Sequence, residues 1–270
     1  MATVAQALAQ ARALGVDRLD AQLILAWQLG RSRSWVIAHD DDALDARQAA
    51  AIHTAFARRV AGEPLAYLLG EKEFHGLLLK VDANVLVPRP DTELLVDWAL
   101  ERLAGIAMPR VVDLGTGSGA IALAVKHART DATVLATDAS LSALDVARAN
   151  AQRLALDVTF AQGSWWFALG DECFDLILSN PPYIAGGDPH LAALTHEPTL
   201  ALTPGGDGLG ALREIIGGAA AHMTDGAWLL LEHGYDQADA AHDLLRERGF
   251  TEIETRRDLG GQPRCTGARR

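Results

Sequence analysis

The sequence predicts an α/β protein in which a small all-helical domain precedes a mainly parallel sheet with helices on both faces. Residues 1–73 carry helical periodicity and almost no strand signal. From residue 110 onward, short apolar runs alternate with helical segments, a pattern typical of a parallel sheet covered by helices. Hydrophobic residues make up 49% of the 270 residues, which is enough to build a substantial core.

The helical segment at residues 1–73 is rich in Ala, Leu, Gln and Arg. Thr3, Asp17 and Ser32 each precede a helical stretch. We expect them to act as N-caps, because a side-chain oxygen can accept hydrogen bonds from the free N–H groups of a first turn. The segment is therefore predicted to form a helical bundle.

The character of the sequence changes at residues 74–90. Alternating and β-branched residues predict a β-hairpin that links the two domains. The second domain is expected at residues 91–270, with strands at the apolar runs and helices between them. The expected strands are 110–114, 132–138, 157–161, 174–180 and 227–234, the expected helices begin near residues 118, 140 and 208, and a helix and a strand close the chain.

Charge and cysteine content narrow the class of protein. Lys+Arg number 24 and Asp+Glu 35, so the net charge of −11 argues against a protein that holds long stretches of nucleic acid by charge. Cys173 and Cys265 lack metal-type spacing. The first residues carry no secretion signal, and no apolar stretch reaches about 18 residues. We expect a cytoplasmic protein without a bound metal or a membrane span.

A glycine-rich turn lies between the first strand of the second domain and the helix after it, in "VVDLGTGSGAIALAV" (111–125). Gly115, Gly117 and Gly119 allow a sharp turn and a close approach of a ligand to the backbone. A tight turn without a ligand is the alternative. The spacing also differs from the dinucleotide-binding fingerprint.

Asp138 closes the next expected strand, 23 positions after Gly115. A parallel βαβ unit places such a carboxylate beside the first loop, where it can accept hydrogen bonds from both ribose hydroxyls of a nucleoside. The alternative is a charge that favours the start of the following helix. The pattern predicts a nucleoside cofactor without choosing which one.

The tetrad Asn180-Pro181-Pro182-Tyr183 follows the apolar run "FDLILS" (174–179). Proline cannot donate to a sheet ladder, so the strand must end here, and two prolines hold the following loop stiff. Because ligands of open parallel sheets bind beyond the carboxyl ends of the strands, Asn180 and the glycine loop are expected to face one crevice. Together these features resemble the class I S-adenosylmethionine-dependent methyltransferases, which have a Rossmann-like fold, and in particular those that methylate planar amide or amino nitrogens.

Four further stretches narrow the resemblance. They are "PLAYLLGEKEFHG" (64–76), "VPRPDTELLVDWAL" (87–100), "SNPPYI" (179–184) and "HEPTLALTPGGDGLGALREII" (196–216). They resemble the HemK/PrmC family, whose members methylate N5 of the glutamine in the Gly-Gly-Gln motif of peptide chain release factors. The resemblance covers nearly the whole chain. It implies S-adenosyl-L-methionine as cofactor, S-adenosyl-L-homocysteine as product, release factors as partners, and a helical first domain that helps to bind the substrate.

The resemblance also implies roles for particular residues. The tetrad becomes a clasp for the substrate glutamine, in which the Asn180 side-chain oxygen and the Pro181 carbonyl accept the two N–H groups of the amide. Pro181 and Pro182 hold the loop stiff, and Tyr183 supplies an aromatic wall. Arg89, Thr92 and Glu93 form a lid over the cofactor, or else a plain joining loop with Thr92 as a helix cap. The implied cofactor-binding residues are Gly115, Thr116, Gly117, Ser118, Gly119, Asp138, Trp166 and Asn180.

The tryptophan of this set departs from the family pattern. The family has Ser-Asp-Trp-Phe near the adenine, whereas this chain has Ser164-Trp165-Trp166-Phe167. Trp166 aligns through the following phenylalanine, and Trp165 stands where an acid is usual. Core packing is the alternative for both indoles.

Two other functions remain open at this stage. Adenine N6-methyltransferases of DNA or RNA use the same tetrad, but a basic recognition face is expected of them and is not evident here. A third possibility is a domain that only binds the cofactor. The tripeptide Gly260-Gly261-Gln262 matches the family's own target sequence, but its surroundings predict the closing hairpin of the sheet rather than a self-substrate.

Overall fold

The computed structural model describes residues 2–270, which divide into two compact units with the boundary between Glu71 and Lys72. The first unit is helical. The predicted N-caps are confirmed: side chains of Thr3, Asp17 and Ser32 accept hydrogen bonds from backbone N–H groups of the first turns. The helices are α1 (Val4–Ala13), α2 (Arg18–Leu29), α3 (Arg33–Ala38), α4 (Ala46–Val60) and α5 (Leu65–Leu69).

The first unit has a hydrophobic core of its own. Its apolar side chains come from the inner faces of all five helices and are almost completely buried. Burial of this kind supplies most of the stability of short helices, which are marginal in isolation. The largest of these core side chains are Ile24, Leu25, Ile52 and Phe56.

A two-stranded sheet is formed by β1 (Glu71–Phe74), which begins at the last residue of the first unit, and β2 (Leu77–Lys80). The second unit also contains a seven-stranded sheet. The larger sheet has the order β5-β4-β3-β6-β7-β9-β8, in which the first five strands are parallel and β9 is antiparallel to both its neighbours. Its strands are β3 (Arg110–Leu114), β4 (Thr133–Asp138), β5 (Thr159–Gln162), β6 (Phe174–Ser179), β7 (Met223–Glu232), β8 (Thr251–Arg257) and β9 (Pro263–Arg269). The predicted α/β fold class is confirmed.

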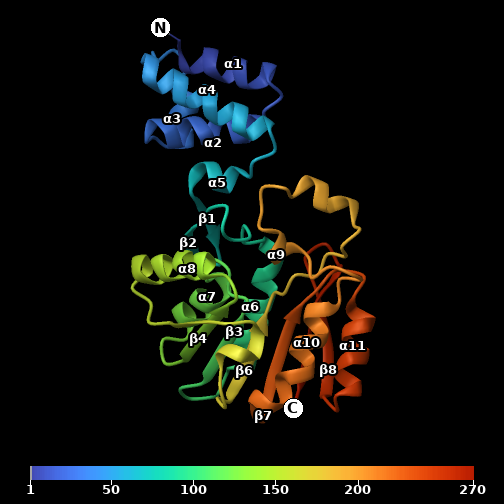
Figure 1. The fold of residues 1–270 in the computed structure, drawn as a ribbon. Coiled ribbons are helices and arrows are strands. Elements are labelled where there is room, and N and C mark those ends of the chain that lie inside the picture. Colours follow the sequence, from blue (N-terminus) through green and yellow to red (C-terminus); the bar gives the residue numbers. More distant parts are fainter. Residues whose placement is uncertain (1) are drawn as a thin grey trace. The chain divides into compact units, whose positions relative to one another are not determined.

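Helices cover both faces of the large sheet (Figure 1). Successive side chains of a strand point to opposite faces, so Val111 packs with α6 to α8 and Val112 with α10 and α11. The α-helices of this unit are α6 (Glu93–Arg102), α7 (Ala120–Ala128), α8 (Leu141–Leu154), α9 (Thr199–Leu202), α10 (Gly210–Ala219) and α11 (Ala238–Glu247). The 3-10 helices are η1 (Pro90–Thr92), η2 (Trp165–Ala168), η3 (Pro189–Ala193) and η4 (Ala220–His222).

The predicted closing hairpin is confirmed, because β8 and β9 are antiparallel and residues 260–262 lie in the turn between them. Several predicted strand limits are off by one or two residues, and the largest difference is at the strand predicted to begin at residue 227. The apolar run suggests residue 227, but β7 begins at Met223, which pairs with Phe174 before an irregularity in the register. Pairing with a neighbour thus extends the strand beyond its apolar segment.

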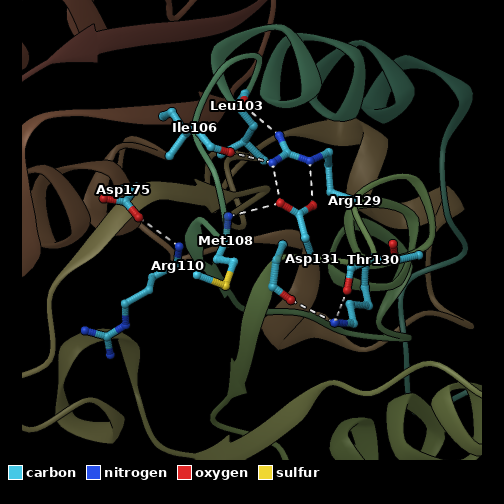
Figure 2. A network of polar contacts seen from close by, with 10 residues as sticks. Leu103, Ile106, Met108, Arg110, Arg129, Thr130, Asp131 and Asp175 are labelled. Carbon is cyan, nitrogen blue, oxygen red and sulfur yellow. Dashed lines mark hydrogen bonds and ion pairs between the residues drawn. The ribbon is translucent and has the colours of Figure 1, made fainter.

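A polar network fixes the amino-terminal ends of β3 and β4 (Figure 2). Arg129 donates to the backbone carbonyls of Leu103 and Ile106, at 2.5 and 2.6 Å. It also donates to both carboxylate oxygens of Asp131, which in turn accepts from the Met108 N–H. The Arg129 side chain lowers the pKa of Asp131. The turn before β3 is therefore tied to the turn before β4, at the edge of the sheet opposite to the carboxyl ends of these strands.

Within residues 2–270, we find neither a helix that is long and apolar enough to cross a membrane nor a group of three or more potential metal ligands.

Candidate active site

The glycine loop joins β3 to α7 in a tight turn. The N–H groups of Gly115 and Thr116 both donate to the Thr137 carbonyl of the neighbouring strand, at 2.9 Å each. Gly119 has a φ of +86°, and a Cβ added there would lie 3.0 Å from Leu123 Cδ1. Only glycine combines this left-handed backbone with so close a packing of helix against loop.

Gly117 stands at the open side of the loop. Its φ is +55°, and a Cβ built there would meet nothing within 4 Å among the described residues. Its N–H donates to Asp138 Oδ2 at 2.9 Å. The backbone at Gly117 therefore faces free space, as a loop that receives a ligand closely requires.

Asp138 occupies the end of β4, as predicted. Besides the Gly117 N–H, it accepts the Ser140 N–H at Oδ1, at 2.8 Å. Burial raises the pKa of this carboxyl, and hydrogen bonds from backbone N–H groups oppose that effect. Each carboxylate oxygen has a second lone pair, so both can still accept a hydroxyl. The carboxylate therefore braces the glycine loop and the start of α8 while it lines the adjoining cavity.

This cavity has a volume of about 730 Å³ and lies beyond the carboxyl ends of the central strands. Residues from the glycine loop, from the end of β4 and from the end of β6 all line it, so the structure brings together three features that are far apart in the sequence. The predicted site residues on its wall are Gly115, Thr116, Gly117, Ser118, Asp138, Asn180 and Pro182.

The other predicted residues of the glycine loop and the tetrad do not line the cavity. Gly119 lies in the packed turn. Pro181 is buried, and Tyr183 is partly buried behind the wall. The backbone carbonyl of Tyr183 accepts from Gln237 Nε2 at 2.9 Å. Burial raises the pKa of its phenol to about 12, and the negative charge of Glu232 adds to the increase.

A glycine-rich loop at residues 203–210 packs against the tetrad and the residues that follow it. Ile184 N–H donates to the Leu202 carbonyl and Gly186 N–H to the Gly206 carbonyl, at 3.0 Å each. A Cβ at Gly208 would lie 2.5 Å from the Tyr183 carbonyl oxygen, so a side chain there would displace the tetrad. The stretch "TPGGDGLG" (203–210) therefore supports the rigid loop that the two prolines begin.

The two indoles have different surroundings. Trp165, with a φ of +45°, lines the cavity, and its ring would lie 3.3 Å from a Cβ added at Gly115. Trp166 instead donates from Nε1 to the Glu214 carbonyl and stacks on His222. The indole on the cavity wall is thus Trp165, not the Trp166 that the family pattern favours.

The three residues of the predicted lid, Arg89, Thr92 and Glu93, also have different surroundings. Arg89 and Thr92 line the cavity, whereas the carboxylate of Glu93 accepts the His75 N–H. Arg89 is held by the buried Glu197, with 2.5 Å between Nη2 and Oε1. Thr92 makes no side-chain capping hydrogen bond at α6 within the described residues. Its hydroxyl oxygen accepts from Asn180 Nδ2 at 3.1 Å.

Glu232 is a residue near the site that the motifs do not single out. It ends β7, and its exposed fraction is 1%. Burial raises its pKa to about 7, and hydrogen bonding by Thr92 and Asn180 and the charge of Arg264 oppose the increase. The only sequence feature that could have indicated Glu232 as a site residue is its position as an acid in the apolar run "AWLLLEHG" (227–234).

Comparisons with known proteins agree with this geometry. A family model described as the PrmC N-terminal domain matches residues 1–70, and one described as the methyltransferase small domain matches residues 90–209. The "Release factor glutamine methyltransferase" of Bordetella pertussis is 51% identical over 94% of this chain and 95% of its own. The protein of the same name from Burkholderia pseudomallei is 48% identical over 99% and 96%.

Among solved structures, the "delta-N METTL16 MTase domain" is 18% identical, with a TM-score of 0.57 over 72% of this chain and 89% of that chain. This likeness concerns the fold alone. The full-length likeness to the curated relatives goes further: the chain belongs to the release factor glutamine methyltransferase family.

Proposed function

We propose that this chain methylates the side-chain amide nitrogen, N5, of the glutamine in the Gly-Gly-Gln motif of peptide chain release factors, with S-adenosyl-L-methionine as methyl donor. The observation that carries the proposal is that Asn180, the glycine loop and Asp138 line one cavity. An amide-binding group and a nucleoside-binding group thus share a space. Family membership supports the choice of a release factor as substrate. Release factors act in the cytoplasm, which is where we place the reaction.

The cavity fits the cofactor in size and chemistry. Its volume of about 730 Å³ lies within the range typical of small-molecule sites. Gly117 leaves room beside the backbone, and Asp138 retains lone pairs for ribose hydroxyls. When bound, S-adenosyl-L-methionine supplies an electrophilic methyl group on a sulfonium. Residues 115–118 and Asp138 would hold it, with Trp165 as the aromatic side chain beside Gly115.

The residues of the tetrad would orient the acceptor. An amide nitrogen is a poor nucleophile because its lone pair is delocalised, and ordinary side-chain bases do not deprotonate it. The Asn180 side-chain oxygen and the Pro181 carbonyl can each accept one N–H of the substrate amide and stabilise the positive charge that develops on nitrogen. Positioning of this kind recovers roughly 7–11 kcal/mol of a barrier in well-oriented reactions. The backbone carbonyl of Tyr183 helps to hold the loop, and the role of its ring as an aromatic wall stays a prediction.

The test is incorporation of labelled methyl groups from S-adenosyl-L-methionine into a purified release factor and into duplex DNA. We expect label in the release factor, on the glutamine of Gly-Gly-Gln when peptides are mapped by mass spectrometry. Asn180→Ala should lower kcat by about 100-fold or more, the loss typical of a removed charge-stabilising group. Label in DNA alone would refute the proposal in favour of adenine methylation.

We also propose that the first unit binds the body of the release factor, because a single exposed glutamine offers little binding energy. Its separate compact core and its match to the PrmC N-terminal domain support this role. Deletion of residues 1–71 should raise KM for intact release factor much more than for a short Gly-Gly-Gln peptide. An equal increase for both substrates would contradict the role.

A further inference from the structure

Glu232 lies beside Asn180 because of the register between two parallel strands. Ser179 of β6 pairs with Leu231 of β7, so Asn180, which follows β6, and Glu232, which ends β7, reach the same point at the carboxyl edge of the sheet. Thr92, from η1, completes the group, and it is only 4% exposed. Glu232 does not line the cavity, whereas Asn180 and Thr92 do. The carboxylate therefore stands one layer behind the site.

The donor and acceptor roles within this group determine which way the Asn180 side-chain amide is turned. Asn180 Nδ2 donates to Thr92 Oγ1 at 3.1 Å. The strand register places Asn180 beside Glu232, and hydrogen bonding by Thr92 and Asn180 lowers the pKa of the Glu232 carboxyl. A hydroxyl can donate or accept, so Thr92 alone would tolerate either orientation of the Asn180 amide. An ionised carboxylate can only accept. It draws the Thr92 hydroxyl proton toward itself, leaves Thr92 Oγ1 as an acceptor, and favours the NH₂ end of Asn180.

We propose that Glu232 is a positioning residue that fixes the Asn180 amide, directly and through Thr92, with its NH₂ group engaged and its oxygen free to accept an N–H of the substrate amide. This inference rests on the proposed function. If the amide turned over, Asn180 would present a donor to a substrate group that itself donates. The orientation of one side-chain amide thus decides whether the clasp accepts its substrate.

A purely structural role for Glu232 makes a different prediction. Removing one partner from a buried ion pair usually destabilises a fold strongly. Within the described residues, however, Glu232 Oε2 has no hydrogen-bond partner. The nearby Arg264 pairs with Asp91 and Asp258, at 3.4 and 3.1 Å. A neutral side chain of the same shape should therefore leave the fold as stable as before or more so.

The kinetic experiment uses the full-length protein, four single variants and one double variant. Glu232→Gln removes the charge, Thr92→Val removes the hydroxyl, and Thr92→Ser retains it. Thr224→Val is the matched control, because Thr224 lies at the opposite end of β7 and its hydroxyl bonds to Phe174 O and Asp175 Oδ1. We measure kcat and both KM values for methylation of a purified release factor, together with melting temperatures near pH 8.

We expect Glu232→Gln and Thr92→Val to lower kcat by at least about 10-fold, as the loss of a charge-assisted hydrogen bond implies. The KM for S-adenosyl-L-methionine should change less than about twofold, and the melting temperature of Glu232→Gln should not fall. Thr92→Ser should restore most of kcat, and Thr224→Val should keep it. The double variant Glu232→Gln/Thr92→Val should lose little more than either single variant, because both changes remove one orienting unit.

Two kinetic results would overturn the proposal: a kcat of Glu232→Gln close to the wild-type value, or a fall in kcat that parallels losses of stability and cofactor affinity.

A second experiment needs no substrate. It follows the ¹⁵N NMR signal of the Asn180 side-chain NH₂, identified by its absence in Asn180→Ala. Its hydrogen exchange should become faster in Glu232→Gln and Thr92→Val but not in Thr224→Val. Unchanged exchange would refute the proposal. A wild-type protein inactive on release factor would refute the proposed function, and the NMR result alone would then decide the role of Glu232.

Discussion

Asp113 offers a test of the electrostatics behind the glycine loop. It is fully buried in β3, and its Oδ2 accepts the Thr116 hydroxyl at 2.6 Å. Burial raises its pKa from 3.8 to about 7, the hydrogen bond from Thr116 opposes the increase, and the negative charge of Asp138 adds to it. The folded chain therefore holds this proton more tightly than the unfolded chain does. Stability falls as the pH rises from about 4 to about 7, where the unfolded chain ionises first.

We predict that Asp113→Asn removes this pH dependence while its side-chain oxygen keeps the bond to Thr116. For a group that titrates near 3.8 unfolded and about 7 folded, the cost of ionisation grows by about 3 kcal/mol between about pH 5 and about pH 8. The free energy of unfolding of the variant, relative to the wild type, should rise by that amount.

Urea unfolding followed by tryptophan fluorescence at both pH values measures the difference. Ile177→Val, in the neighbouring strand β6, is the control, because it shortens a fully buried apolar side chain and should cost about 1 kcal/mol at either pH. A difference between Asp113→Asn and wild type that stays constant, or shrinks as the pH rises, would refute the raised pKa.

Three further variants test other parts of the structure. Gly117→Ala should weaken binding of S-adenosyl-L-methionine by about 10-fold or more in calorimetry, because its φ of +55° strains alanine and the new Cβ enters the cavity; an unchanged Kd would contradict the placement of the cofactor. Gly267→Ala should cost about 1–3 kcal/mol of stability in urea, because its Cβ would lie 2.4 Å from Leu230 Cδ2, and a wild-type midpoint would show that β9 packs less tightly. Arg129→Ala should lower the melting temperature and leave kcat unchanged, because it removes donors from two backbone carbonyls at the edge remote from the site; equal melting temperatures would refute a stabilising role for the network in Figure 2.

Local chemistry explains the features that could be predicted from the sequence. An N-cap such as Asp17 satisfies N–H groups two or three residues away, so its signal is complete within a few positions. The glycine loop and Asp138 belong to one βαβ unit, whose geometry is nearly fixed. The prediction that they and Asn180 face one crevice used only the rule that parallel strands end at the same edge, and all three line the cavity. Their roles in binding and catalysis stay predictions.

The features that could not be predicted depend on backbone detail or on distant partners. Trp165 faces the cavity with a φ of +45°, a conformation that non-glycine residues rarely adopt. No sequence pattern predicts this conformation. Glu232 reaches Asn180 only because β6 and β7 pair in a particular register. Thr92 arrives from a segment 88 positions away from Asn180 in the sequence. Motifs indicate the residues at the cavity wall better than those that hold them in place.

The two buried carboxylates share a position relative to the cavity, and this position bears on why the chain keeps them. Asp113 lies behind Thr116, and Glu232 lies behind Thr92 and Asn180, each one layer from the wall. Burial raises both pKa values to about 7, so both groups oppose folding near neutral pH. A sheet selected for stability alone would favour apolar residues at these strand ends. Because the acids fix the hydroxyl and amide groups that face the cavity, their cost to the fold is best explained by the orientation that they impose on the proposed cofactor loop and substrate clasp.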